Sequence, residues 1–187
     1  MFNMRARNSS RGYGAVAMAL HWAVVVLVLG AWLIGQFGDE LPRGAPRETG
    51  LFVHMSLGLA VIAFAITRLF WRLRDPPPPP EQSPLGSWGK RASKAVHYLI
   101  YVALIAVPIA GIVLQFARGH ALPIFGLFEI ASPWPADRAF AHDVKEVHEV
   151  LANGMLALIG LHAAAALVHH FIFRDRTLLR MLPVTRS

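Results

Sequence analysis

Two histidines near the C-terminus, His148 and His162, are spaced so that both could hold the same kind of cofactor. They lie fourteen residues apart on one apolar segment. At roughly 100° per residue, this spacing falls about 40° short of four full helical turns, so both imidazoles face the same side. It also separates them along the helix axis by about 21 Å. One helix therefore predicts two cofactor levels.

Each level needs a second histidine from another helix. His54 opens the second apolar segment and lies at the depth of His148. His21 lies six residues into the first segment from the opposite end and approximately matches the depth of His162, a difference that helix tilt can absorb. We refer to His54 and His148 as the outer pair, and to His21 and His162 as the inner pair.

Two histidines on facing helices suit haem iron, which then has both axial positions filled and serves electron transfer. Zinc normally takes three or four protein ligands, and the only carboxylate at a suitable depth is Glu149, beside His148. The chain has no cysteine, which excludes disulfides, thiolate catalysis, iron–sulfur clusters and cysteine-linked haem. The residues therefore predict two b-type haems, held without a covalent link.

Three further residues could contribute to cofactor binding. Gly58 follows His54 by one helical turn and either leaves room for a porphyrin or serves a helix–helix contact. Arg68 lies on the same face further inward, where it could pair with haem propionates or reach lipid phosphates. His97 opens the third segment at the inner level. It could replace an inner ligand, or hydrogen-bond a propionate or a quinone headgroup.

The other four histidines have no predicted role in haem binding. Two fall in the outer loop and two at the inner membrane boundary, namely His120, His142, His169 and His170.

The elements that position these residues are long apolar segments. Of the 187 residues, 55% are hydrophobic and 16% charged, whereas soluble domains are about a quarter charged. Four segments each hold enough residues to cross a hydrocarbon core of roughly 30 Å. They are Ala15–Phe37, Leu51–Trp71, Ala95–Ala117 and Val147–Phe173. The sequence predicts an all-α integral membrane four-helix bundle, forming a single domain over residues 1–187.

The connections between the segments are rich in proline and polar residues. GDELPRGAPRETG is expected to form a short polar turn. RDPPPPPEQSPLGSWGK contains five consecutive prolines and is expected to be a stiff, extended, non-helical connector. The segment Arg118–Glu146 is expected to be the longest loop.

The formal net charge of +7 comes from Lys and Arg at the ends of the apolar segments. This placement favours topology signals and contact with anionic lipid, and argues against nucleic-acid binding, which needs a basic stripe. Thirteen of the 18 basic residues fall on the side of both termini and the polyproline connector. Both termini are therefore expected to be cytoplasmic. The first segment lacks a signal-peptide cleavage site and is expected to be retained.

Motifs in all four segments resemble those of the bacterial cytochrome b561 family. They read MALHW, FVHMSLG, HYLIYVALIAVPIAG and VHEVLANGMLALIGLHAAAALVHH, followed by the similar ending FRDRTLLRMLP. The resemblance runs from about Tyr13 to Pro183. The outer loops and the long polyproline connector are the least similar parts.

The resemblance implies a bacterial inner-membrane protein whose haem ligands are paired as above. Similarity to short, stand-alone members that oxidise superoxide implies that superoxide reacts near the outer pair and that ubiquinone receives the electrons. Lys145 matches a lysine of those members and would attract the anion, unless it is an ordinary interfacial lysine. The direction of flow stays open, since quinol could also reduce a periplasmic acceptor.

Two other functions remain as alternatives. The chain could be a haem-bearing membrane-anchor subunit that relays electrons between a partner dehydrogenase and quinone, although its stand-alone length disfavours this. It could also be a haem-free transporter that uses histidines as proton relays. Co-purification with a dehydrogenase would favour the first alternative, and a purified sample without haem absorbance would favour the second.

Overall fold

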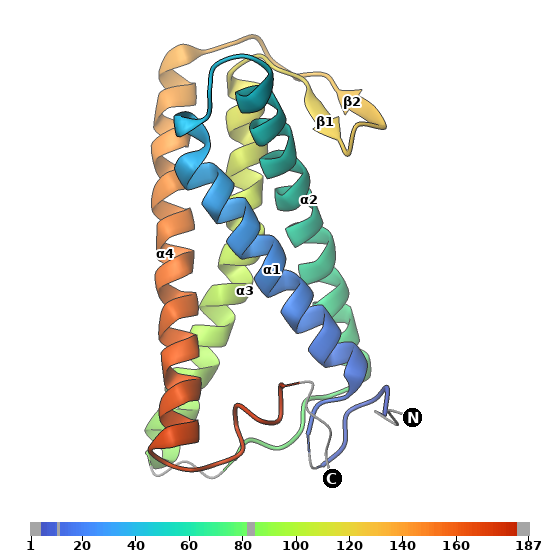
Figure 1. The fold of residues 1–187 in the computed structure, drawn as a ribbon, viewed down its shortest axis with the longest axis vertical. Helices are drawn as coiled ribbons and strands as arrows, with labels where there is room; N and C mark the ends of the chain where they lie inside the picture. Colours follow the sequence, from blue (N-terminus) through green and yellow to red (C-terminus); the bar gives the residue numbers. More distant parts are fainter. Residues whose placement is uncertain (1–4, 11, 82–84, 183–187) are drawn as a thin grey trace.

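The computed structural model describes residues 5–10, 12–81 and 85–182. Four long helices run side by side along the length of the molecule (Figure 1). A short 3₁₀ turn, η1 (Gly38–Glu40), follows the first helix, and a two-stranded hairpin precedes the last. The helices are α1 (Ala15–Phe37), α2 (Ala45–Arg74), α3 (Gly86–Ala117) and α4 (Arg138–Phe171). The predicted all-α four-helix membrane bundle is confirmed.

All four helices are long and apolar enough to cross a membrane. Their outward faces carry large apolar side chains such as Val26, 68% exposed, and Phe70, 63% exposed. Exposure of so much apolar surface to water would be unfavourable, whereas the hydrocarbon chains of a lipid bilayer can cover it. The buried core is correspondingly small and centres on Val28, Val61 and Leu104.

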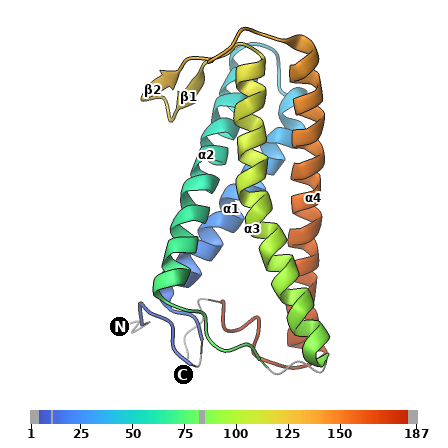
Figure 2. The same cartoon turned by 180° about the vertical axis from the view of Figure 1, so that it is seen from behind.

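The helices associate as two antiparallel hairpins. α1 packs along α2 and α3 packs along α4, while α2 and α3 make a shorter contact. Within the described part of the chain, α1 and α4 do not pack along their lengths. Figures 1 and 2 show α1 crossing the bundle obliquely. The space between the two hairpins is where ligands from α1, α2 and α4 meet.

The connector between α2 and α3 is shorter than expected. The sequence predicted an extended chain through Lys90, but α3 already begins at Gly86, so this part of the prediction is wrong. Proline disfavours helix at interior positions and for the residue just before it, and does not prevent a helix from starting beyond it. The Gly86–Lys90 segment, GSWGK, contains no proline and therefore continues as helix.

The two helices that follow the outer loops, α2 and α4, also begin earlier than expected. The expected loop through Glu146 is wrong, since α4 starts at Arg138, where the Asp137 side chain accepts a hydrogen bond from the Phe140 N–H. The first turns of α4 contain several polar residues, so they lack the continuous apolar pattern by which the membrane segments were predicted. Likewise, α2 starts within the expected polar turn, after Gly44, whose φ of 88° reverses the chain.

A β-hairpin occupies the middle of the long outer loop, an element that the sequence did not predict. Strand β1 (Leu122–Ile124) pairs antiparallel with β2 (Phe128–Ile130). Phe125 and Gly126 both take positive φ values in the connecting turn. The hairpin projects sideways beside α2 (Figures 1 and 2).

The segments 5–10 and 172–182 lie with the polyproline connector at the opposite end of the bundle (Figure 1). Arg180 is 7% exposed, forms an ion pair with Glu81 at 3.2 Å, and donates a hydrogen bond to the Pro79 carbonyl. The Asn8 backbone N–H donates to the Asp75 carboxylate at 2.8 Å. These contacts tie the N-terminal segment, connector and C-terminal tail together. Arg11 and Arg186, which counted towards the charge asymmetry, lie outside the described residues, as do connector residues 82–84 and Pro183.

Candidate haem sites

The outer pair brings His54 of α2 opposite His148 of α4. Their ring centroids lie 6.1 Å apart and the ring planes cross at 79°. His54 Nδ1 donates to the Ala31 carbonyl at 2.8 Å, and His148 Nδ1 donates to the Val107 carbonyl at 3.0 Å. A carbonyl oxygen only accepts, so Nδ1 carries the proton in both rings. Nε2 therefore keeps the lone pair that a metal requires.

The inner pair has nearly the same spacing. The centroids of His21 and His162 lie 6.4 Å apart and the planes cross at 73°. In contrast to the outer pair, His21 Nδ1 is buried and has no hydrogen-bond partner among the described residues. The two pairs are therefore alike in spacing and different in the way their rings are held.

Both spacings fit an iron atom between two imidazoles. A metal–imidazole bond is about 2 Å long, so two such bonds plus the two ring radii separate the centroids by roughly 6 Å. The part of the chain that the structure describes has no cluster of three or more metal-ligating side chains, as a protein zinc site would need. The arrangement therefore suits haem better than zinc.

His97 lies beside the inner pair in a different geometry. Its ring centroid is 4.9 Å from that of His162, with the planes at 77°, which is an edge contact too short to enclose a metal. Its Nδ1 donates to the Ser93 carbonyl at 2.6 Å. His97 is therefore better placed to support His162 than to replace it as the partner of His21.

A cavity of about 60 Å³ lies between the inner histidines. Arg68 and His97 line it, and the Arg68 guanidinium stacks over the Tyr101 ring at 5.5 Å. Arg68 thus faces the ligand pair, as its expected pairing with propionates requires. Buried Val24, Val28 and Leu104 also line the cavity, so its walls are largely apolar apart from the histidines, Arg68 and Tyr101.

Glycines contact the outer pair, but Gly58 is not among them. A Cβ added to Gly58 would meet only Pro108 of α3 at 3.9 Å. Its role in leaving room for a porphyrin therefore stays a prediction. A Cβ on Gly35 would lie 2.9 Å from His54 Cε1, and one on Gly111 would lie 3.2 Å from His148 Cε1. Sequence reasoning missed Gly35 and Gly111. Their signal was a glycine inside an apolar segment at the depth of a ligand.

Lys145 lies one turn before His148, as expected, but it is not a free charge. Its ammonium forms an ion pair with Glu149 at 3.2 Å, and about half of each side chain is exposed. The paired carboxylate offsets part of the attraction that the lysine would exert on an anion.

The remaining histidines lie away from the two pairs. His142 pairs with Glu146 at 3.3 Å on the exposed start of α4, and His120 is exposed. His169 Nδ1 contacts the Asp175 carboxylate at 2.5 Å. Burial raises the pKa of Asp175, but hydrogen bonds from His169 and Thr177 outweigh burial and hold it below its usual value. His170 Nδ1 is buried without a described partner.

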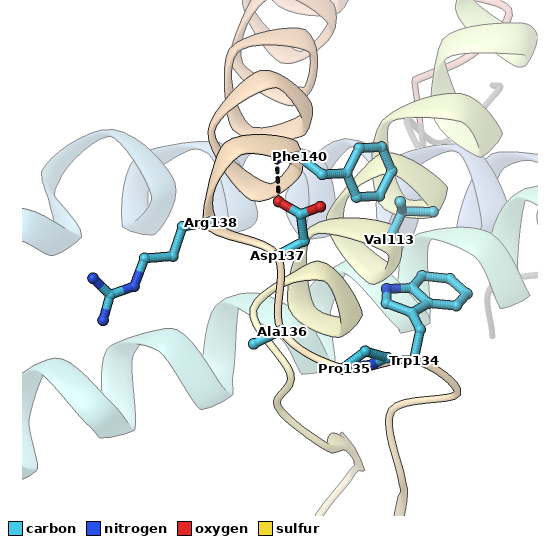
Figure 3. Close-up of a pocket in the computed structure, with 7 residues that line it drawn as sticks. All are labelled: Val113, Trp134, Pro135, Ala136, Asp137, Arg138 and Phe140. Carbon is cyan, nitrogen blue, oxygen red and sulfur yellow. Dashed lines mark hydrogen bonds between the residues drawn. The ribbon is translucent and has the colours of Figure 1, made fainter.

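An open hollow of about 710 Å³ lies at the outer end of the bundle, where the loop enters α4. Three apolar side chains gather on one side of this hollow, namely Val113, Trp134 and Phe140, whereas Arg138 points away from them (Figure 3). No histidine lines this hollow. It contributes no ligand to either pair.

Comparison with known proteins finds relatives along almost the whole chain. A family model described as prokaryotic cytochrome b561 matches residues 12–184. The probable superoxide oxidase CybB of Yersinia pestis is 36% identical over 177 residues, covering 94% of this chain and 98% of the relative. Cytochrome b561 homolog 2 of Escherichia coli (strain K12) is 31% identical over 190 residues, covering 98% of both chains. Cytochrome b561 homolog 1 of the same strain is 32% identical over 174 residues, covering 88% of this chain and 93% of the relative.

Proposed function

This chain belongs to the prokaryotic cytochrome b561 family, and we propose that it binds two haems and carries electrons from superoxide to quinone. As a member of this family, it is a multi-pass bacterial membrane cytochrome that uses b-type haem in electron transfer. The outer pair would serve the superoxide side and the inner pair the quinone side.

The observation that carries the proposal is the repetition of one ligand geometry at two levels. Centroid separations of 6.1 Å and 6.4 Å both suit an iron bound by two imidazoles. In both pairs, one histidine comes from α4 and the other from the α1–α2 hairpin. The two histidines of a pair therefore face each other across the space between the two helix hairpins. A protein with a single haem would need only one of these pairs.

The protein's own residues would orient the cofactors and insulate them. Haem supplies the one-electron chemistry when it is bound. The two histidines of each pair would hold one haem, so a small molecule would exchange electrons with that haem without binding its iron. Arg68 would neutralise propionate charge at the inner level, where it lines the cavity. The apolar helices would keep water away from the electron path.

Two electrons must cross the bundle for each quinone. Two superoxide anions would each lose one electron and leave as dioxygen, and one quinone would take up two electrons and two protons to become quinol. The name of the Yersinia pestis relative supports superoxide as the donor. Lys145, one turn from His148, supports the approach of an anion to the outer end.

The same proposal fixes the orientation in the inner membrane. The end of the bundle that holds segments 5–10 and 172–182 and the connector would face the cytoplasm, because most Lys and Arg residues belong to the N-terminal, connector and C-terminal regions of the sequence. The outer pair would then lie towards the periplasm, where superoxide arriving from outside the cell has direct access.

The test begins with the haem content of the purified protein, measured against protein mass by the pyridine haemochrome assay. Two haems per chain are expected. Anaerobic stopped-flow mixing with superoxide should then reduce the haems, and added ubiquinone should reoxidise them. If quinol reduces a protein with two haems and superoxide does not, electrons flow in the opposite direction or the chain acts as an anchor subunit. One haem per chain, or none, would refute the di-haem proposal.

A further inference from the structure

Each ring of the outer pair is held by one turn of a neighbouring helix. The His54 ring lies against Gly35, close enough that an added Cβ would approach Cε1 to 2.9 Å. Its Nδ1 donates to the carbonyl of Ala31, which lies four residues before that glycine. The helix therefore provides both a flat surface for the ring and an acceptor for its proton.

The second ring of the outer pair repeats this arrangement on a different helix. The His148 ring lies against Gly111 of α3, where an added Cβ would approach Cε1 to 3.2 Å. Its Nδ1 donates to the carbonyl of Val107, again four residues before the glycine. We call these two arrangements the glycine cradles: Ala31 with Gly35, and Val107 with Gly111.

Helix geometry explains why a glycine occurs at the fourth position. The Cα–Cβ bond tilts towards the N-terminus of a helix, so a side chain covers the turn that precedes it. A residue with a side chain at position 35 or 111 would therefore cover the carbonyl that the histidine uses. Glycine leaves this carbonyl open to a second donor, because a carbonyl oxygen has two lone pairs.

The inner pair lacks this support at one of its ligands and has a cation nearby. His21 Nδ1 is buried with no hydrogen-bond partner among the described residues. Arg68 lines the cavity between His21 and His162. The outer rings therefore have proton acceptors behind them, and the Lys145 charge near them is paired with Glu149. The inner level combines a ring that lacks a described hydrogen-bond partner with the charge of Arg68.

These differences act in one direction on the reduction potentials. A hydrogen bond from Nδ1 makes the imidazole a more basic ligand, which stabilises the oxidised metal. A nearby cation stabilises the reduced state, because reduction removes one positive charge from the metal. We propose that the glycine cradles position the outer ligands and make the outer haem the lower-potential centre of the two. An electron that enters at the outer level then moves inward as the outer centre is oxidised and the inner centre reduced, with no proton released at the cradles.

This inference rests on the proposed presence of two haems, and a redox titration tests the two statements separately. The purified holoprotein is titrated while its haem α-band absorbance is recorded. Two one-electron steps are expected. His21→Ala should leave only the outer haem and the lower-potential step, while His54→Ala should leave only the inner haem and the higher-potential step.

The cradles themselves are tested by Gly35→Ala and Gly111→Ala. Both should raise the lower-potential step and leave the other in place. We expect an increase of about tenfold in the reduced-to-oxidised ratio at a fixed potential, taking as a guide the effect that changes behind a metal ligand have on metal affinity. The effect should be larger for Gly35→Ala, whose contact is tighter. Gly154→Ala is the matched control, since an added Cβ there would meet nothing within 4 Å.

The outcomes separate the two proposals. A wild-type protein with fewer than two haems would end the di-haem function. Two haems with the outer centre at the higher potential would overturn the inference and leave that function intact. The inference would also be overturned if both cradle variants moved the inner step, or neither step. If Gly35→Ala loses the outer haem, the milder Gly111→Ala and the single-haem variants still decide the order of potentials.

Discussion

Trp32 of α1 donates its indole N–H to the side-chain oxygen of Asn153 on α4 at 3.2 Å. This hydrogen bond joins two helices that do not pack along their lengths. It crosses the space between the helix hairpins and lies between His148 and His162 along α4. The hydrogen bond therefore connects α1 to α4 on the side of the bundle where these two helices do not pack together.

Removal of this link should destabilise the bundle moderately. Hydrogen bonds between membrane helices contribute about 0.6 kcal/mol on average and at most roughly 1.7 kcal/mol. Trp32→Phe and Asn153→Ala should each lower the thermal midpoint in detergent, followed through loss of the Soret band. In a double-mutant cycle, the two changes together should cost less than the sum of the single changes. Strict additivity would mean that the hydrogen bond contributes nothing.

Removal of single ligands should remove one haem at a time. His54→Ala or His148→Ala should leave about half the haem, in the inner site, because a bis-histidine site does not survive with one ligand. His21→Ala or His162→Ala should leave the outer haem instead. Haem content and the low-spin electron paramagnetic resonance signal report the result. Retention of two haems in both variants of either pair would show that the pair is assigned incorrectly.

Loss of the Arg68 charge should affect the inner site alone. Arg68→Gln should weaken inner haem retention by about tenfold, since changes to groups that support a metal site have effects of this size. The inner potential should fall at the same time, because a cation no longer stabilises the reduced state. Arg74→Gln, at the exposed end of the same helix, is the control. An equal loss from both sites would indicate general misfolding.

The ion pair between Lys145 and Glu149 should modulate the reaction with an anion. Lys145→Ala should slow reduction by superoxide a few-fold at low ionic strength, because it removes a positive charge near the outer pair. Glu149→Gln should accelerate the same step, because it releases the lysine from its partner. Both effects should shrink in high salt. Reduction by a neutral donor serves as the control, and an equal effect on that donor would argue against electrostatic steering.

The contact between His169 and Asp175 should stabilise the C-terminal tail in a pH-dependent way. The pKa of Asp175 is lower in the folded protein than its usual value of 3.8. Its stabilising effect is therefore fully present above that value and is lost as the pH falls through the folded pKa. Asp175→Asn should lower the thermal midpoint at pH 6, and the difference from wild type should narrow below about pH 4. A difference that stayed constant down to pH 3 would exclude an ionised carboxylate as its cause.

The sequence predicted which histidines lie opposite one another better than it predicted the residues around them. The period of an α-helix places His148 and His162 on one side of one helix without reference to any other element. By contrast, whether Gly35 or Gly58 contacts a ligand depends on how neighbouring helices cross, and small residues in membrane helices also serve close helix packing. The early start of α4 was missed for a related reason. A helix that extends beyond the lipid is held by its cap at Asp137 and loses the apolar signature used to find it.

Both ligand pairs draw one member from α4, the last of the four helices to leave the ribosome. The first helix hairpin carries one partner for each level, and the third helix carries none of the four. Under the di-haem proposal, neither haem could be bound by both of its histidines until the final helix has entered the bilayer. The newly made chain would then remain without haem until α4 is in place, and haem delivery would be the final step of its assembly.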